Sequence, residues 1–343
     1  MELFPRTRTT LSGNLSAGAL VLAAFVIYAI VGNNGYLLSV GTTISMTAIA
    51  VIGLSLVIGR AGQLNFGQAG FMALGAYLSA WVTRDWHFNF LLGILVGALS
   101  AGVVGLLVGV IALRLRGNYL AMATLGTGAI IFGLFSVNSP FGGPNGFSSI
   151  PTLALGPLEV TSPMGQYIFC GVALGIVYVF SVWLLSTRFG RELAALRDDE
   201  VGALALGIPV VARKVEIFTL SAVMAGIAGS IDAALQTTID PGLFAISVSL
   251  QLFLMVVLGG LGSVPGAVFG TALVLGILQV VPGTGDHALV VMGAAVIVAM
   301  TFFAGGLAGI LRQGDRPAAF GLSKLGLEDL VRRLGMQSGT EHR

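Results

Sequence analysis

Residues 89–113 read NFLLGILVGALSAGVVGLLVGVIAL, an apolar run of 25 positions without a charged side chain. About 20 apolar residues in a helix are long enough to cross the hydrocarbon core of a bilayer. The glycines spaced through this run would let neighbouring helices approach closely, which is typical of packing between transmembrane helices. The run therefore predicts a membrane-spanning helix, and it suggests that lipid is the solvent for the rest of the chain.

The composition of the whole chain agrees with this prediction. Of its 343 residues 56% are hydrophobic and 9% are charged, 50 are Gly, and the mean hydropathy is +0.95. Too few polar side chains are present to cover a water-soluble fold of this size. We therefore expect an all-α integral membrane protein. Uncharged runs predict about ten transmembrane segments, at 15–33, 37–58, 66–83, 89–113, 119–137, 164–186, 215–235, 247–264, 265–281 and 288–310.

Lys and Arg predict the orientation, because they gather on the cytoplasmic side of membrane proteins. With the N-terminus in the cytoplasm, 16 of the 17 Lys and Arg residues lie inside and Arg84 alone lies outside. Both chain ends are then cytoplasmic. This topology gives an N-terminal segment at 1–14, a transmembrane domain at 15–311 and a tail at 312–343. Within the domain it gives an external loop at 138–163 and a cytoplasmic loop at 187–214.

The cytoplasmic loop is the most charged part of the chain. Residues 188–208 read RFGRELAALRDDEVGALALGI, with seven charged side chains in 21 positions. Apolar residues at helical spacing predict one or two short helices, with Asp199 as the cap of the second and Gly207 at its end. We expect the apolar side (Leu193, Leu196, Val201, Leu204, Ala205 and Ile208) to face the membrane. The side facing the cytoplasm would carry Arg191, Glu192, Arg197, Asp198, Asp199 and Glu200. A solvated loop needs neither helical periodicity nor caps, so this pattern favours a docking surface for a soluble partner.

Two Gly-rich segments interrupt apolar runs at corresponding places. The first is 59–70, GRAGQLNFGQAG, and the second is 259–270, GGLGSVPGAVFG, with glycines coinciding at the first, fourth and twelfth positions. The match predicts two related halves with broken helices. Transporters place substrate paths at such breaks. The residues predicted to line a translocation path are Gly59, Gly62, Gln63, Asn65, Gln68, Gly259, Gly262 and Pro265.

The three amide side chains of the first segment have two interpretations. Gln63, Asn65 and Gln68 either offer hydrogen bonds to a solute or bond to neighbouring helices and strengthen their packing. For an amino-acid solute, we also expect the carboxylate to bind at the N-terminus of a broken helix. Asp232 is an ionisable residue within a predicted span. It is either a functional site or, beside Thr237 and Asp240, a group near the outer water.

No residue pattern predicts enzymatic chemistry. The chain has no GxxxxGK[ST] segment for ATP, and its three His and one Cys do not form a cluster with metal-ligand spacing. We expect no bound metal, no cofactor and no nucleic-acid partner.

Four segments together resemble the M-type permease subunits of branched-chain amino-acid ABC importers. They occur in the family's order across about residues 40–310. They are 59–77 (GRAGQLNFGQAGFMALGAY), 113–125 with 142–146 (LRLRGNYLAMATL and GGPNG), 186–208 (the charged loop) and 257–270 (VLGGLGSVPGAVFG). The resemblance implies that residues 191–207, ending at Gly207, form a coupling helix that docks on an ABC ATPase subunit. It also implies a pore shared with a second homologous permease, a periplasmic or extracellular substrate-binding protein, and a location in the bacterial cytoplasmic (inner) membrane.

Three alternatives remain open at the level of sequence. Relatives of this kind also carry urea, amides or small carboxylates. An ion-coupled secondary transporter would use Asp232 as its proton or cation site. A passive channel for a small neutral solute would need neither ATP nor Asp232.

Overall fold

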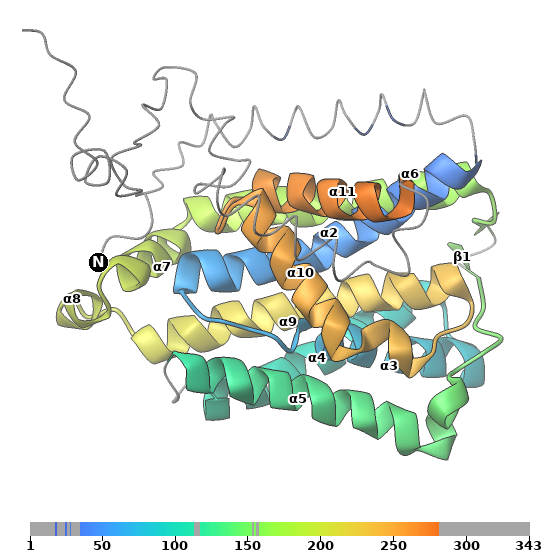
Figure 1. The fold of residues 1–343 in the computed structure, drawn as a ribbon, viewed down its shortest axis with the longest axis horizontal. Helices are drawn as coiled ribbons and strands as arrows, with labels where there is room; N and C mark the ends of the chain where they lie inside the picture. Colours follow the sequence, from blue (N-terminus) through green and yellow to red (C-terminus); the bar gives the residue numbers. More distant parts are fainter. Residues whose placement is uncertain are drawn as a thin grey trace, which may run out of the picture.

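The computed structural model describes residues 18, 25, 28, 35–112, 117–152, 154–155 and 158–280. The expected segments at 1–14, 288–310 and 312–343 lie outside these residues, and the expected span at 15–33 lies almost entirely outside them. The other eight expected spans each correspond to a helix (Figure 1). The all-α expectation is confirmed. The one sheet in the described part pairs two strands of two residues each, β1 (Ala154–Leu155) and β2 (Leu158–Glu159).

The helices begin and end within a few residues of the predicted runs. They are α2 (Gly35–Ala61), α3 (Gln68–Asp85), α4 (Phe90–Ala112), α5 (Asn118–Val137), α6 (Pro163–Ser186), α7 (Arg188–Asp198), α8 (Glu200–Ala205), α9 (Val210–Gln236), α10 (Ile246–Gly259) and α11 (Val264–Val280), with 3-10 turns at Ser139–Phe141, Gly143–Asn145 and Pro241–Phe244. Six helical segments of the described part are long and apolar enough to cross a membrane. Ten crossings are therefore not confirmed.

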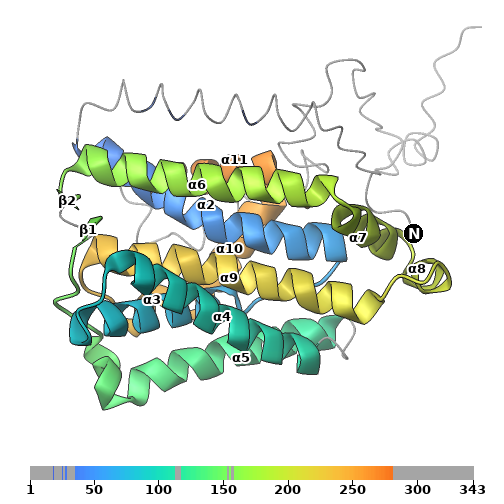
Figure 2. The same ribbon diagram turned by 180° about the vertical axis from the view of Figure 1, so that it is seen from behind.

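The apolar side chains are distributed as a bilayer requires. Helices α2 and α9 run through the middle of the bundle (Figures 1 and 2). In the most apolar 18-residue stretch of each, 89% and 78% of the residues are buried. In the corresponding stretches of α4, α5 and α6, only 33% of the residues are buried. These outer helices expose large apolar side chains such as Leu99, Ile130 and Ile176. Water would not tolerate so much exposed apolar surface, so these faces are suited to lipid.

The two ends of the bundle carry different structures. Helices α7 and α8 extend from one end, while β1 and β2 lie at the opposite end (Figures 1 and 2). The predicted cytoplasmic loop and the predicted external loop are therefore on opposite sides of the molecule. At the second end, the loop after α5 pairs with the loop after α9 through a bridge between Phe147 and Ile239.

Glycine allows the central helices to touch through their backbones. Gly75 of α3 faces Gly226 of α9, and a Cβ at Gly75 would overlap the Gly226 carbonyl. Ser230 of α9 donates a hydrogen bond to the Gly75 carbonyl at 3.1 Å. Close approach of this kind explains why a chain with so much glycine forms stable helices, because the small residues lie at helix crossings.

Candidate functional site

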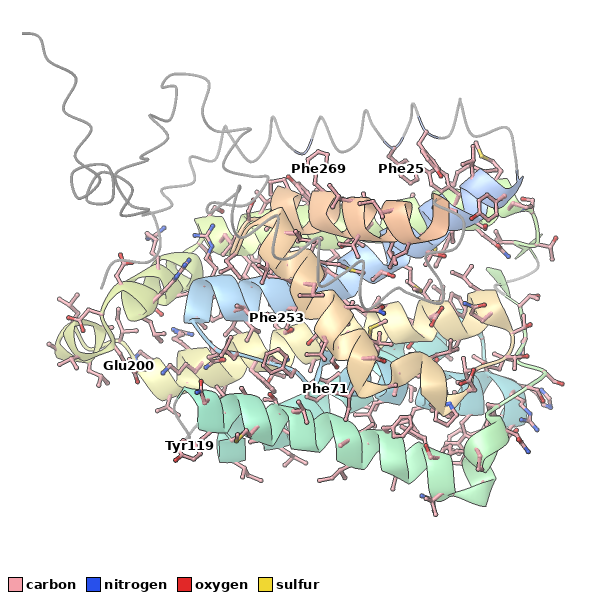
Figure 3. All side chains as sticks on the ribbon, in the orientation of Figure 1. Phe25, Phe71, Tyr119, Glu200, Phe253 and Phe269 are labelled. Atoms are coloured by element: carbon pink, nitrogen blue, oxygen red, sulfur yellow. The ribbon has the colours of Figure 1, made fainter. Side chains whose placement is uncertain are left out.

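The first Gly-rich segment is a true break between two helices. Helix α2 ends at Ala61, the chain is irregular through 62–67, and α3 begins at Gln68. Gly62 has a φ of +66°, a left-handed conformation that favours glycine. Phe66 packs on Phe253 of α10 with ring centroids 4.9 Å apart (Phe253 is labelled in Figure 3). The break is thus in contact with another helix of the same chain.

Two of the three amides hold the break in place. Asn65 donates to Gln68 Oε1 at 3.1 Å and accepts from the Gly67 N–H at 2.9 Å. Gln68 donates to the carbonyls of Ala50 at 3.0 Å and Ser221 at 3.3 Å, and the Ser221 hydroxyl donates back to Gln68 Oε1. For Asn65 and Gln68 the structure thus favours the packing interpretation.

The beginnings of α3 and α11 are already capped by protein. The Gly67 N–H donates to Asn65 and the Ala69 N–H donates to the Ser249 hydroxyl at 3.0 Å. At the start of α11, the Gly266 N–H donates to the Ser263 hydroxyl at 3.2 Å. These donors are therefore engaged within the protein, and binding of a solute carboxylate at a broken-helix N-terminus stays a prediction.

Gln63 differs from the other two amides. Its side chain is 4% exposed, and neither Oε1 nor Nε2 has a hydrogen-bond partner in the described part of the chain. Leaving a buried donor or acceptor without a partner costs about 1–3 kcal/mol. Gln63 is therefore the amide of this break that keeps its hydrogen-bonding capacity for a solute, for water or for another conformation.

The second Gly-rich segment meets the first one directly. Gly262 has a φ of +77°, so it matches Gly62 in conformation as well as in position within the segment. A Cβ at Gly59 would overlap the backbone of Gly262, and a Cβ at Gly259 would overlap that of Gly266. Pro265 is the second residue of α11, where no helical N–H is needed. The two segments therefore form one close-packed site, although common ancestry of the two halves stays a prediction.

Two arginines cross-link this site. Arg60, 7% exposed, donates from Nε to the Gly262 carbonyl at 3.0 Å. Arg197 of α7 donates from Nη1 to the Gly59 carbonyl. We call Gly59, Arg60 and Gly262 the glycine junction. Sequence reasoning missed Arg60, treating it as a loop cation; its position directly after an apolar run was the available signal.

The helices of the charged loop form where they were predicted. Helices α7 and α8 are separated at Asp199, whose carboxylate accepts the Val201 N–H at 3.0 Å and so caps α8. Gly207 has a φ of +76° and follows the end of α8. The predictions of two short helices, of the Asp199 cap and of a terminating Gly207 are confirmed.

The prediction that Glu192 faces the cytoplasm is wrong. Its side chain is buried, and it is held by Arg188 at 2.7 Å and by Arg213 of α9 at 2.5 Å. The hydrogen bond from Arg188, together with the one from Arg213, lowers the pKa of Glu192 below its ordinary value despite the opposing effect of burial. A further ion pair joins Glu200 to Lys214 at 2.9 Å (Glu200 is labelled in Figure 3). These pairs fix the loop to the first turns of α9, and sequence reasoning did not foresee either cationic partner.

The apolar side chains of α8 are exposed, and the predicted contact of this side with the membrane stays a prediction. Val201, Leu204 and Leu206 are 75%, 56% and 79% exposed, while Leu193 and Leu196 of α7 are buried. Arg191, Asp198, Asp199 and Gly207 are exposed beside them, whereas Arg197 is half-buried and directed inward. We call Val201, Leu204 and Leu206 the apolar patch of α8. Exposed apolar groups rimmed by charge mark an interaction surface.

Asp232 lies one turn before the end of α9 at Gln236 and is half-buried. That end of α9 adjoins the paired outer loops. The described residues contain no group of three or more His, Cys, Asp and Glu side chains able to hold a metal ion. This position favours the interpretation of Asp232 as a group near the outer water.

Comparisons with known proteins identify the family of the chain. The model of a family described as "Branched-chain amino acid transport system / permease component" matches residues 36–307. The high-affinity branched-chain amino acid transport system permease protein LivM of Escherichia coli (strain K12) is 32% identical over 290 residues, 77% of this chain and 68% of the relative. LivH of the same strain is 25% identical over 262 residues, 70% of this chain and 82% of the relative. The L-arabinose ABC transporter permease protein AraH of Azospirillum brasilense is 28% identical over 245 residues, 69% of this chain and 68% of the relative. No solved structure matches the chain.

Proposed function

Because the chain belongs to the family of branched-chain amino acid transport permeases, we propose that it is a membrane-spanning subunit of an ATP-binding-cassette importer that moves branched-chain amino acids inward. The observation that carries this proposal is the extent of the family match. It runs through residues 36–307 and so includes both Gly-rich segments and the charged loop. The residue patterns that first suggested a transporter thus lie within the part of the chain that the family shares.

ATP hydrolysis belongs to a partner in this proposal. The chain has no phosphate-binding GxxxxGK[ST] segment, so a separate ABC ATPase subunit supplies the energy. Residues 187–214 form the coupling loop on which that subunit docks. The apolar patch of α8 enters a cleft of the ATPase, and the exposed Arg191 and Asp198 orient it at the rim.

A second permease completes the pore. Similarity to both LivM and LivH of one strain supports a pair of different permease subunits rather than two copies of one. A substrate-binding protein delivers the solute at the end of the bundle that carries β1 and β2. The chain then lies in the cytoplasmic membrane of a bacterium with both ends in the cytoplasm, as the distribution of Lys and Arg favours.

Transport follows from alternating access at the glycine junction. ATP-dependent docking on the coupling loop biases the membrane helices between inward-facing and outward-facing arrangements. The Gly-rich segments line the path, and Gln63 offers its amide to the passing solute. A branched aliphatic side chain needs an apolar wall, which the helices around the break supply.

Co-purification tests the proposed function. The chain is extracted from its own membranes in a mild detergent that preserves complexes, and its partners are identified by mass spectrometry. The proposal expects an ABC ATPase and a second, related permease in stoichiometric amounts. A chain purified alone under conditions that keep other ABC importers intact would contradict it.

A further inference from the structure

The contacts between the coupling loop and the Gly-rich segments converge on the glycine junction. Arg197 of α7 donates to the Gly59 carbonyl, and the neighbouring Arg60 donates to the Gly262 carbonyl at 3.0 Å. The Gly59 and Gly262 backbones are in direct contact, with no room for a side chain at Gly59. A continuous series of polar and backbone contacts therefore runs from α7 to both Gly-rich segments.

The chemistry of these contacts makes them stiff. Gly59 lies in the last turn of α2, where backbone carbonyls have no partner within the helix. The Arg197 guanidinium supplies that partner from an element 138 residues away. A guanidinium presents its donors in a rigid planar fork. It therefore absorbs less of a displacement of α7 than a flexible ammonium group would. A shift of α7 would therefore move the end of α2.

The same geometry excludes Arg197 from the outer surface of the loop. Its Nη1 is directed to the Gly59 carbonyl and its side chain is half-buried. Arg191 on the same helix is exposed, as is the apolar patch of α8. The loop thus separates two tasks between different side chains: contact with a partner and contact with the membrane helices.

We infer that Arg197 is a positioning residue that transmits movement of the coupling loop to the glycine junction, rather than a contact for the ATPase. This inference rests on the proposed function. Movement of α7 displaces Gly59 through Arg197, and Gly262 follows because it is packed against Gly59 and bonded to Arg60. Both Gly-rich segments then move together, which changes the surroundings of Gln63 within the first segment.

The test uses the intact importer, co-purified and reconstituted in proteoliposomes with its binding protein. Solute uptake and ATP hydrolysis are measured together, and uptake per ATP is the readout. Arg197→Ala should leave assembly and ATP hydrolysis in place while lowering uptake per ATP at least tenfold. Arg197→Lys, which keeps one donor and the charge, should restore part of that ratio.

Arg188→Ala is the matched control. It removes an arginine from the same helix, but the Arg188 side chain is 86% exposed and its partner Glu192 is also held by Arg213. Any weakening of the loop in this variant should lower uptake and ATP hydrolysis in proportion, so that uptake per ATP stays at the wild-type value. A wild-type ratio in Arg197→Ala would overturn the inference, as would failure of both the Ala and the Lys variants to assemble, because that outcome indicates a purely structural role. Absence of an ATPase from the wild-type complex would contradict the proposed function itself.

Discussion

At the scale of single residues, the two glutamines of the first Gly-rich segment differ in their hydrogen bonding. Gln68 is bonded to α2 and α9, while Gln63 has no partner among the described residues. Both are almost completely buried. Sequence alone could not distinguish them, because each is an amide in the same apolar surroundings. Only the three-dimensional positions of Ala50 and Ser221 decide which amide is engaged.

Leu substitutions separate these roles. Gln63→Leu should leave the thermal stability of the purified complex unchanged or higher, because it removes a buried amide without a partner, and it should lower solute uptake several-fold. Gln68→Leu should destabilise the chain by about 1–3 kcal/mol, because it leaves buried backbone and hydroxyl groups unpaired. Thermal unfolding in detergent and uptake in proteoliposomes measure both effects. A Gln63→Leu variant with full uptake would remove this residue from the path.

Glu192 makes the coupling loop sensitive to acid. Because its pKa in the folded chain is lowered, its ion pairs stabilise the loop at neutral pH, and this contribution is lost as the pH falls through the lowered pKa. Amide hydrogen exchange in α7, corrected for intrinsic rates, should therefore quicken below about pH 4. Glu192→Gln should show fast exchange already at pH 7 and little further change in acid. Equal pH profiles in the two proteins would contradict this account.

At the scale of elements, α8 depends on its cap. Asp199 accepts the Val201 N–H, and loss of such a cap costs about 1 kcal/mol. Asp199→Ala should therefore fray α8 and weaken binding of the ATPase to the apolar patch, whereas Asp199→Asn keeps an acceptor and should retain most of the affinity. Binding of the purified ATPase to the permease pair in detergent measures this. Equal losses in both variants would indicate that the charge, and not the cap, is important.

Packing of α3 against α9 depends on the contact between Gly75 and Gly226. Gly75→Ala places a methyl group against the Gly226 backbone, and overpacking of this kind costs about 1–3 kcal/mol. Gly126→Ala on α5 is the control, because no described atom lies within 4 Å of its added Cβ. The first variant should unfold at a lower temperature than wild type and the second should not. Equal unfolding temperatures of Gly75→Ala and wild type would show that α3 and α9 can move apart without a loss of stability.

The elements themselves could be predicted from sequence to a large extent. Long apolar runs such as 89–113 give helices at almost the same residues, because helix length in lipid follows directly from hydropathy. The burial of Glu192 and the exposure of Val201 and Leu204 could not be predicted. Both depend on where α9 begins relative to α7, which is a tertiary relation that helical periodicity alone does not contain.

At the scale of the whole molecule, the structure separates the end that carries α7 and α8 from the end that carries β1 and β2. The apolar patch of α8 lies at one end and the paired outer loops lie at the other (Figures 1 and 2). The glycine junction connects the first end to the centre of the bundle. This arrangement is suited to an energy source that acts from the cytoplasm on a path between helices, and it gives Asp232 no central position.

The proposed function also predicts how transport responds to energy and to Asp232. Uptake should require hydrolysable ATP and should continue, within about twofold, in Asp232→Asn, because the proposed function gives this half-buried acid near the end of α9 no coupling role. Uptake by whole cells after ATP depletion, with the membrane potential maintained, measures this. Transport that survives ATP depletion but is lost in Asp232→Asn would favour an ion-coupled secondary transporter.

The most direct test of an ATP-driven importer for branched-chain amino acids is uptake of labelled leucine by proteoliposomes that hold the co-purified complex and its binding protein. The account predicts uptake only with hydrolysable ATP, and competition by unlabelled isoleucine and valine but not by arabinose. Uptake without ATP would contradict the importer. ATP-driven uptake that arabinose competes for and the amino acids do not would contradict the proposed solute.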